Sequence, residues 1–531
     1  MGVYEKEQSR VGATLRFRRS GRCLKAIRTF GAVWLVVCLP VLFLQCSPSS
    51  PVQSTKPDAS SKGVPKTRKP AIPPPRRGVV PSATCATLSK ALPSQKQDQA
   101  GRVLSEPKDK IAFIYDQTQL RTFELQLSKE NLAKLDADPT AEVYVKGKLI
   151  YDGKTYEPVG IRYKGSIGSW VGCTERGAGG NPFGIGGAKI CPKLNFKVSF
   201  NKYNSSGRFF GAKKLLFHAM NADFSLMRER LGYWLFRQMG VPAPRAVHVR
   251  LLVNGVYAGV FLNLEYIDGR FTRSRFADGK GNLFKEIWPT ASYMQPKLTE
   301  HRWRSGLRTN EDESPSMQKM LDFGKAVMQS SGDASAKAIQ DWMSVENTLR
   351  FIAVDRATRS DDGPFHFYCN GSRCQNHNFY IYEEEKANRV WLIPWDLDRS
   401  FVIKGGGMAD GFVRVVDRWN DHTVTCRPRP GGLSAGPWQM PPSCDPLFKS
   451  LGCHFGTRYR NILKGLLDGP YSKSTVEKML GIWQKQIAKI VQEAHDKNKR
   501  QLSPTHWQAG IVDLKKRIEI IRKEVSQQLK P

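Results

Sequence analysis

The chain has 531 residues, of which 40% are hydrophobic and 10% aromatic, and it carries a formal net charge of +34. This length and apolar content predict one large two-lobed domain, or two ordinary ones, with flanking tails. The positive charge is compatible with nucleic acid, anionic lipid, cell-wall polymer or an acidic protein. Because zinc-finger spacing, an RNP-like aromatic pair and a basic zipper are all missing from the sequence, we expect no nucleic-acid partner.

The start of the chain has the layout of a secretory signal. Basic residues crowd positions 1–28, an apolar run covers 30–44, and a polar stretch follows. The run is shorter than the ~20 residues that span a bilayer comfortably, and Pro40 interrupts it. We expect a signal peptide or membrane anchor over residues 1–46 and an extracytoplasmic protein, secreted or membrane-tethered. Lipidation at Cys46 is left open as a route to membrane attachment.

Residues 47–108 are rich in Ser, Pro, Lys and Thr and contain few apolar side chains. Such a segment buries too little surface to offset the entropy lost on ordering, so we predict a disordered tether. Eight cysteines follow residue 46, and an even number in an exported chain fits disulfide pairing. Cys173 and Cys191 are placed to staple a Gly-rich stretch, and we predict that Cys369 and Cys374 are joined.

Between residues 109 and 268 the pattern is mostly that of strands. Ser128 is expected to cap a short helix, and a longer amphipathic helix is predicted over 225–239. The strongest hairpin signal is Asn254-Gly255, between two apolar runs. The predicted strands lie near 123–127, 144–151, 156–163, 194–200, 247–253 and 256–264.

After residue 268 the pattern becomes mainly helical, notably over 315–356. Strands are expected at 378–382 and 390–393, loops over 402–448, and amphipathic helices from 471 onward. The mixture of strands and helices predicts an α+β fold.

The densest polar cluster of the chain lies between residues 360 and 398. Carboxylate and amide oxygens are hard ligands suited to Mg²⁺ or Mn²⁺ bridging phosphates, and a further carboxylate can orient an attacking hydroxyl. A single Asp usually caps a turn, but this many around two strands favour a site. The cluster comprises Asp361, Asp362, His377, Asn378, Asp396 and Asp398.

Basic residues of the first half extend the same interpretation. Lys197 lies in mid-strand on the polar face, where it is placed to reach phosphates, although most strand lysines are merely exposed. Arg162, Lys164 and Ser166 form a basic turn that could cover an anion. The turn is neither a Walker loop nor GxGxxG, so alone it is a weak signal.

Five short motifs follow one another between residues 159 and 398. They are 159–166, similar to a glycine loop; 195–201, similar to a lysine strand; 253–259 leading to 264–268, a hairpin and hinge; 376–382; and 394–398. In this order they resemble the CotH family of spore-coat-type atypical protein kinases.

The resemblance implies a two-lobed atypical protein-kinase-like fold. A mixed-strand N-lobe would cover residues 109–268, and a mainly helical C-lobe with a metal site would cover 269–470. The helices over 471–531 would pack on the C-lobe. The implied activity is transfer of the γ-phosphoryl of ATP to Ser or Thr of an exported or surface protein.

The resemblance also implies roles for individual residues. Asp362 would be the catalytic carboxylate, while Asn378 and Asp396 would hold Mg²⁺ or Mn²⁺. Lys197 would hold the α- and β-phosphates and pair with Glu229. The ATP-binding set is Arg162, Lys164, Ser166, Lys197, Glu229 and Glu265.

Two departures from the family pattern and two other functions stay open. Residues 364–375 look inserted, and the doublet Asp361-Asp362 leaves the catalytic register ambiguous, with Asp362 fitting better. A non-catalytic surface protein of the same fold, acting as adhesin or assembly scaffold, is one alternative. Nucleotidyl transfer on the same scaffold is another. The joint presence of Lys197, Asp362, Asn378 and Asp396 favours catalysis. The scarcity of ATP outside the cytoplasm argues against it.

Overall fold

The structure, a computed structural model, describes residues 108–175, 185–290, 298–360, 362–370, 373–403, 426, 429–430 and 438–530. The predicted signal or anchor, nearly all of the predicted tether, and Asp361 lie outside the described residues. Strands and helices both contribute to the described part, so the predicted α+β class is confirmed.

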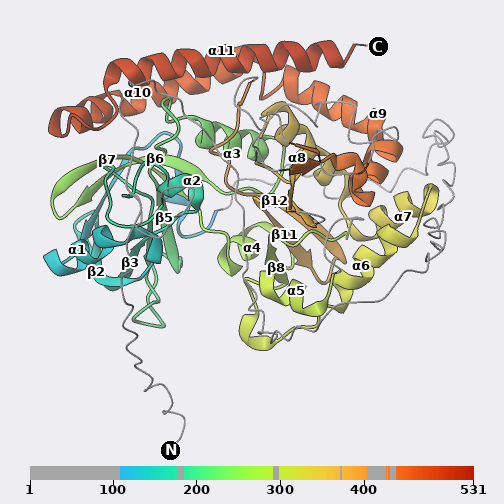
Figure 1. Cartoon of the computed structure of the whole chain (residues 1–531), viewed down its shortest axis with the longest axis horizontal. Helices are drawn as coiled ribbons and strands as arrows, with labels where there is room; N and C mark the ends of the chain where they lie inside the picture. The colour runs from blue at the N-terminus through green and yellow to red at the C-terminus, as the bar shows by residue number, and fades with distance from the viewer. Residues whose placement is uncertain are drawn as a thin grey trace, which may run out of the picture. The chain divides into compact units, whose positions relative to one another are not determined.

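Strands of the first half close into a barrel, coloured blue to green in Figure 1. Neighbouring strands are antiparallel except β1 and β6, which are parallel. The barrel order is β1-β2-β3-β4-β5-β7-β6. The strands are β1 (Arg121–Gln126), β2 (Val145–Tyr151), β3 (Lys154–Tyr163), β4 (Phe196–Ser199), β5 (Lys214–His218), β6 (Ala246–Val253) and β7 (Val256–Leu264).

Alternation along β4 shows how the sequence builds this barrel. Phe196 and Val198 belong to the apolar cluster inside it, and Lys197 between them lies on the outer face. On β5, Leu216 and His218 share that outer face, and Leu216 joins the apolar cluster of the helical part. The outer face of β3 to β5 therefore faces the helical part of the molecule.

Three helices accompany the barrel. Ser128 accepts from the amide of Asn131 and caps α1 (Lys129–Ala137), as predicted. The short α2 (Ile167–Trp170) follows β3 closely, and α3 (Arg228–Gln238) occupies the predicted helix. Every residue of α3 from Glu229 to Arg237 is buried.

The helical part surrounds a three-stranded sheet, in the order β12-β11-β8. Its strands are β8 (Asn282–Lys285), β11 (Phe379–Glu384) and β12 (Arg389–Pro394). A smaller sheet contains β9 (Phe367–Asn370), β10 (Arg373–Gln375), β13 (Arg429–Pro430) and β14 (Trp438–Met440). The helices are α4 (Gly269–Arg275), α5 (Glu300–Gly306), α6 (Gln318–Gln329), α7 (Asp333–Trp342), α8 (Val345–Ala357) and α9 (Pro446–Asp468).

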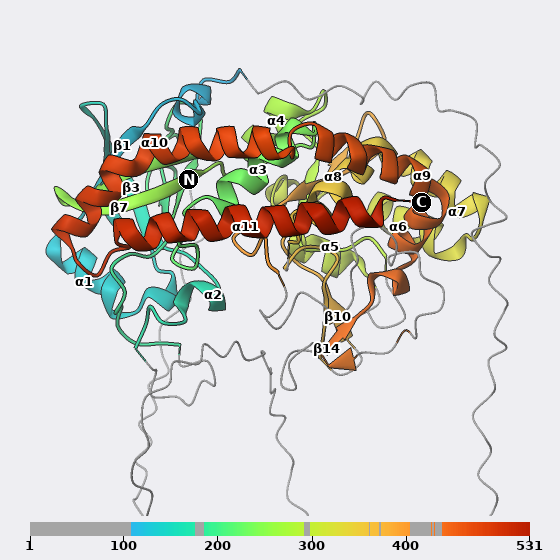
Figure 2. The ribbon, with the colours of Figure 1, turned by 90° about the horizontal axis from the view of Figure 1, so that it is seen from above.

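Two long C-terminal helices, α10 (Lys473–Lys497) and α11 (Pro504–Gln528), run side by side across both parts, as Figures 1 and 2 show. α10 packs against β7, where the Tyr257 hydroxyl donates to the carbonyl of Ile490 (3.0 Å). α11 packs against α8 and α9. The helices thus contact the barrel as well as the helical part on which we expected them to pack.

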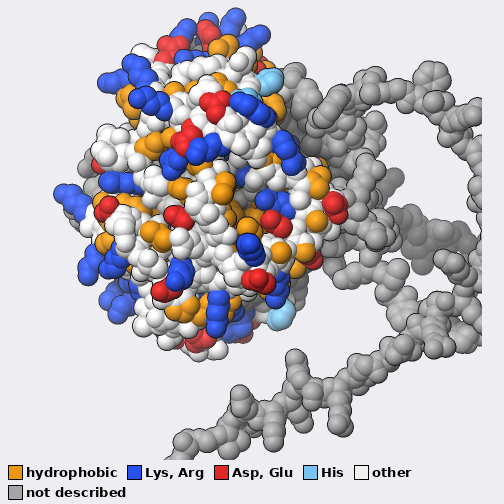
Figure 3. Space-filling view, turned by 90° about the vertical axis from the view of Figure 1, so that its left-hand side faces the viewer, with side chains coloured by type: hydrophobic (Ala, Val, Ile, Leu, Met, Phe, Trp, Pro, Cys, Tyr) orange, Lys and Arg blue, Asp and Glu red, His pale blue; other side chains and the backbone are white. Residues whose placement is uncertain are grey.

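Three disulfides join described cysteines: Cys173–Cys191, Cys369–Cys374 and Cys426–Cys444. The first two confirm the predicted pairs. Disulfides persist in oxidising compartments, so they indicate an extracytoplasmic protein. Within the described residues, no helix combines the length and apolar character needed to cross a membrane. Figure 3 shows Lys and Arg side chains scattered over one face of the molecule, with Asp and Glu between them.

Candidate functional site

A cavity of about 160 Å³ lies where the barrel meets the helical part. Its wall comes from the segment after β3, the residues before β4, the loop after β5, helix α3, and the segment after β12. The side chains that line it are rich in charge. The polar and charged ones are Lys164, Ser166, Ser169, Asn195, His218, Asn221, Asp223, Glu229, Lys285, Asp396 and Asp398.

A lysine, a histidine and a glutamate form a chain of hydrogen bonds on one wall. Lys164 Nζ lies 2.9 Å from His218 Nε2, and His218 Nδ1 lies 3.0 Å from both carboxylate oxygens of Glu229. This fits the tautomer in which Nδ1 carries the proton and donates to Glu229, while the lysine donates to Nε2. His218 is 6% exposed and Glu229 is 3% exposed. The buried His218 and Glu229 side chains have little freedom to move, so the hydrogen bond from Lys164 to His218 fixes the position of the lysine ammonium.

Asp396 and Asn378 lie together because of the pairing between β11 and β12. Phe379 pairs with Pro394, so the residue before β11 and the loop after β12 meet at one end of the sheet. Asn378 and Asp396 both have positive φ, at 61° and 54°. Residues other than glycine rarely adopt this conformation, and it is concentrated at functional sites. The Asp396 amide is fixed by donating to the Tyr233 hydroxyl on α3 (3.0 Å).

The cavity gathers carboxylates that repel one another. Burial and the nearby Glu229 raise the pKa of Asp396, while Lys164 and His218 oppose the shift. Burial, followed by Asp396 and Glu229, raises the pKa of Asp398 well above its ordinary value. Burial lowers the pKa of Lys164, against the attraction of Asp396 and Glu229. An added cation near the carboxylates would relieve this repulsion.

Asp362 is the centre of a second group of hydrogen bonds beside the cavity. Its Oδ1 accepts from His377 Nε2 (2.7 Å) and from the Tyr368 hydroxyl (2.8 Å), and its Oδ2 accepts from Asn378 Nδ2 (2.9 Å). Burial alone would raise the pKa of Asp362, but the charge and hydrogen bond of His377, with the Tyr368 bond, hold that pKa well below its usual range. Asp362 is therefore an oriented, ionised carboxylate.

The residues fit a hard divalent cation that a ligand helps to hold. No group of three or more His, Cys, Asp or Glu side chains in the described ranges is arranged as a complete metal site. Mg²⁺ ordinarily takes only one or two carboxylates and completes its shell with phosphate oxygens and water. Asn378 donates through its amide nitrogen to Asp362, so its amide oxygen is the atom left for a cation. Asp396 and Asn378 thus supply suitable donor atoms.

Lys197 lies outside the cavity, in a basic cluster on the same outer face of the barrel. Arg162 on β3 pairs in register with Lys197 on β4. The ammonium groups of Lys197 and Lys214 lie 4.9 Å and 4.8 Å from the centre of the Tyr266 ring. Burial, then the charges of Lys214, Arg162 and Lys164, lowers the pKa of Lys197 to about 7.

Glu265 is buried away from the cavity in a cluster of arginines. Its carboxylate accepts from Arg245 (2.7 Å), Arg270 (2.7 Å) and Arg275, and it is 0% exposed. Arg245 and Arg270 also pair with Asp109. This arrangement gives Glu265 a structural role in the segment after β7.

The structure brings together Lys164, Ser166, Glu229 and Asp396 around one cavity, with Asp362 and Asn378 beside it. It does not bring Lys197 to Glu229, whose partner is His218. Sequence reasoning gave no role to His218 or Tyr368. Both follow or belong to apolar runs, and only the spatial neighbours of their polar atoms distinguish them from core residues.

Comparison with known proteins gives consistent matches. The family model described as "CotH kinase protein" matches residues 161–524, which is more than half of the chain. "Inner spore coat protein H" of Bacillus subtilis (strain 168) is 26% identical over 231 residues, covering 42% of this chain and 59% of that protein. "Inner spore coat protein H-like protein" of the same organism is 38% identical over 73 residues, covering 14% of this chain and 22% of that protein. The matched stretches span less than two thirds of either relative.

Proposed function

The chain belongs to the CotH family, and we propose that it is an exported protein kinase that transfers the γ-phosphoryl of ATP to Ser or Thr of an exported or surface protein. The observation that carries the proposal is the cavity in which Lys164, held by His218 and Glu229, faces Asp396. Phosphoryl transfer depends mainly on positioning and charge stabilisation, and this wall supplies both.

In the proposed site, Lys164 binds phosphate oxygens and Ser166 lies at the cavity wall beside them. Asp396 and Asn378 hold Mg²⁺ or Mn²⁺, which when bound would neutralise charge on the phosphate oxygens. The repulsion among the carboxylates of Asp396, Asp398 and Glu229 supports this assignment, because a bound cation would offset their negative charge. Lys285, which also lines the cavity, is a second candidate for contact with the transferred group.

Asp362 is proposed to orient the acceptor hydroxyl. Its lowered pKa keeps it ionised, and three donors fix its two oxygens. An ionised carboxylate in a fixed position can accept a hydrogen bond from a hydroxyl and direct it at the phosphorus. His377 and Tyr368 act through Asp362 in this proposal and are positioning residues.

The basic cluster beside the cavity is proposed to bind the rest of the nucleotide. Arg162 on β3 precedes Lys164 by two residues, or about 6.6 Å at 3.3 Å per residue of extended chain. Arg162 pairs in register with Lys197, whose ammonium lies over the Tyr266 ring, so the proposed nucleotide extends from Lys164 towards these two residues. This retains a nucleotide-binding role for Arg162 and Lys197, but not for Glu265.

The direct test is titration of the full-length protein with ATP and Mg²⁺ or Mn²⁺ by calorimetry, with transfer of labelled phosphate to the protein's own Ser and Thr followed in parallel. Saturable, metal-dependent binding together with transfer is the expected result. Saturable binding without transfer would point to a non-catalytic member of the fold. Absence of binding with either metal would contradict the proposal.

Replacing His218 by Leu is expected to weaken Mg·ATP binding by about 10–100-fold, in the range found when residues that orient ligands are removed. The lysine then loses the group that fixes its ammonium. His218→Gln should retain part of the affinity, because an amide still bonds to both neighbours. His248→Gln is the matched control: His248 is also buried, but it bonds to Arg230 and to the Leu226 carbonyl. Equal affinities for the Leu variant and the control would exclude the role.

Lys197→Met should raise stability slightly while weakening nucleotide binding. At pH below about 7 the folded protein holds a charged, half-buried lysine beside Lys214. Because the pKa is lowered on folding, the unfolded chain binds more protons between pH ~7 and ~10.4, and wild-type stability rises with pH in that window. The variant loses this rise and should gain about 1–3 °C in Tm at pH 6.5. Differential scanning calorimetry at pH 6.5 and 9 tests it, and a lowered Tm at pH 6.5 would contradict it.

A further inference from the structure

The disulfide Cys173–Cys191 joins two chain segments that both enter the cavity wall. One segment carries Lys164, Ser166 and Ser169 and continues through α2 to Cys173. The other leaves Cys191 and reaches Leu194 and Asn195, which line the same cavity. The covalent bond therefore lies a few residues from lining residues on both sides.

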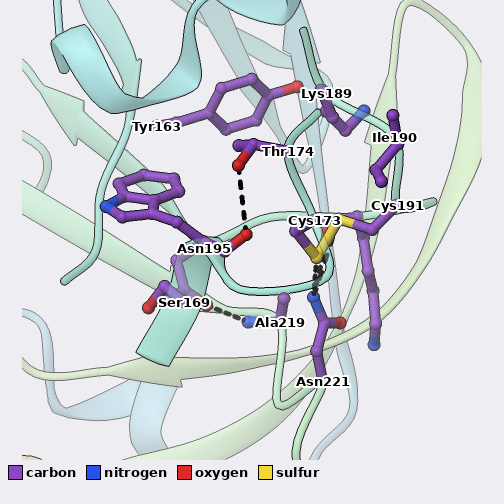
Figure 4. Close-up of a disulfide and its surroundings, with 12 residues drawn as sticks. Tyr163, Ser169, Cys173, Thr174, Lys189, Ile190, Cys191, Asn195, Ala219 and Asn221 are labelled. Carbon is purple, nitrogen blue, oxygen red and sulfur yellow. Dashed lines mark hydrogen bonds between the residues drawn. A yellow bond between two sulfur atoms is a disulfide. The ribbon is translucent and has the colours of Figure 1, made fainter. Parts of the chain in front are cut away.

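Hydrogen bonds connect the disulfide to a third part of the wall, as Figure 4 shows. Asn221 Nδ2 lies 3.3 Å from Cys173 Sγ and donates to the carbonyl of Lys193 (2.8 Å). Asn221 belongs to the loop after β5 and itself lines the cavity. The disulfide thus fixes the side chain of a lining residue from a separate segment.

Asn195 connects the same three segments a second time. Its Nδ2 donates to Ser169 Oγ (3.2 Å), and its Oδ1 accepts from the amide of Ala219 (2.6 Å). The Ile190 amide also donates to the carbonyl of Cys173 (2.9 Å). These hydrogen bonds are partly exposed, and each contributes only modestly to the stability of the cavity wall.

We propose that the disulfide Cys173–Cys191 is a redox switch that assembles the wall of the phosphate cavity when oxidised and releases it when reduced. The choice of Mg·ATP as the ligand rests on the proposed function. The loosening of the cavity wall on reduction does not depend on it. Oxidation outside the cytoplasm would then complete the site, so the protein would bind its ligand more tightly after export than before it.

The switching step is a thiol–disulfide exchange with a dithiol. Cys173 is 5% exposed and Cys191 is half-buried, so a thiolate of the dithiol attacks Cys191 Sγ. The S–S bond breaks and Cys173 leaves as a thiolate, which takes up a proton. The second thiol of the reductant then closes its own disulfide and releases Cys191. Two electrons pass from the dithiol, which is oxidised, to the protein, which is reduced.

Reduction should weaken binding of Mg·ATP by about tenfold, because binding would then have to order two or three side chains that the disulfide holds in place. Cys173→Ser/Cys191→Ser should bind as weakly, and its affinity should not change with dithiothreitol. The matched control is Cys426→Ser/Cys444→Ser, which removes another disulfide with the same sequence separation of 18. It should bind as wild type and still respond to reduction. An unchanged affinity in Cys173→Ser/Cys191→Ser would overturn the proposal.

Asn221→Ala provides a second variant in which the disulfide is intact. It should lower affinity partway, because the link between Cys173 and the loop after β5 is lost while the fold keeps its covalent bond. Full wild-type affinity in this variant would show that the disulfide does not act on the cavity through that loop.

Hydrogen exchange gives a readout that needs no nucleotide. In the Cys173→Ser/Cys191→Ser variant, amides of residues 164–175 and 190–195 and of Ala219 should exchange faster, while those of α10 and α11 should not change. If oxidised wild type fails to bind ATP but shows this difference, the proposed function fails and the switch stands. If these amides are equally protected in both proteins, the switch fails.

Discussion

Asp396→Asn is expected to weaken binding of Mg·ATP or Mn·ATP by about 100-fold or more and to abolish phosphoryl transfer. The change removes the proposed charged ligand, and the described residues hold no group of three or more His, Cys, Asp or Glu side chains that could replace it. Binding of ATP without metal should change little or increase, since Asp396 then contributes only repulsion. Calorimetry with and without metal, on full-length protein, separates these effects.

Asp362→Asn should give a different signature. Nucleotide binding should remain nearly intact, while transfer falls by about 10²–10⁴, because orientation and assistance of the hydroxyl are lost. Asp152→Asn is the matched control for both variants: Asp152 lies in the exposed turn between β2 and β3 at a positive φ that Asn also tolerates. Equal metal-dependent affinity in wild type and Asp396→Asn would remove the metal assignment and most of the case for catalysis.

The strands of the barrel were predictable where apolar and polar residues alternate along the chain. Phe196, Lys197 and Val198 alternate, and β4 was found for that reason. β5 was missed because Leu215, Leu216 and Phe217 are all buried, which gives a continuous apolar run without a period of two. Closure of the barrel through the parallel pair β1 and β6 depends on contacts far apart in sequence, which no local pattern encodes.

The candidate site was predictable in its carboxylates but not in its lysine. Asp396 and Asn378 flank two strands that pair locally, so sequence order alone places them together. Lys164 directly follows β3, and Lys197 lies on the neighbouring strand β4. Whether Lys164 or Lys197 lies near Asp396 depends on which end of the barrel packs against the helical part. His218, on the strand that was missed, could not be identified as the partner of Glu229.

Glu265 gives the second large expected effect, and it concerns stability. Glu265→Gln should destabilise the protein by about 3–5 kcal/mol, the cost of leaving buried charges without their partner. Its carboxylate is the common partner of Arg245, Arg270 and Arg275. Asp109 would remain to compensate two of the arginines, and Arg275 would lose its ion pair.

The control for this effect is Glu493→Gln. Glu493 also pairs with an arginine, Arg250, but the two side chains are 30% and 24% exposed. Pairs of this kind contribute about 0–1 kcal/mol. Urea unfolding of wild type and both variants at pH 7.5 measures the difference, and similar losses in the two variants would show that the buried cluster is not a main source of stability.

Repeating the unfolding measurement at acidic pH tests whether Glu265 is the carboxylate that stabilises the arginine cluster. Burial would raise the pKa of Glu265, but Arg275, Arg245 and Arg270 hold it well below its ordinary value. A pKa lowered on folding stabilises the native state above the unfolded value of about 4.3, and this stabilisation is lost as the pH falls through and below it. Wild type should therefore lose stability more steeply than Glu265→Gln between pH 5 and pH 3, and their unfolding free energies should converge. Parallel curves over that range would mean that Glu265 is not the group that titrates, and the arginine cluster would then need another counter-charge.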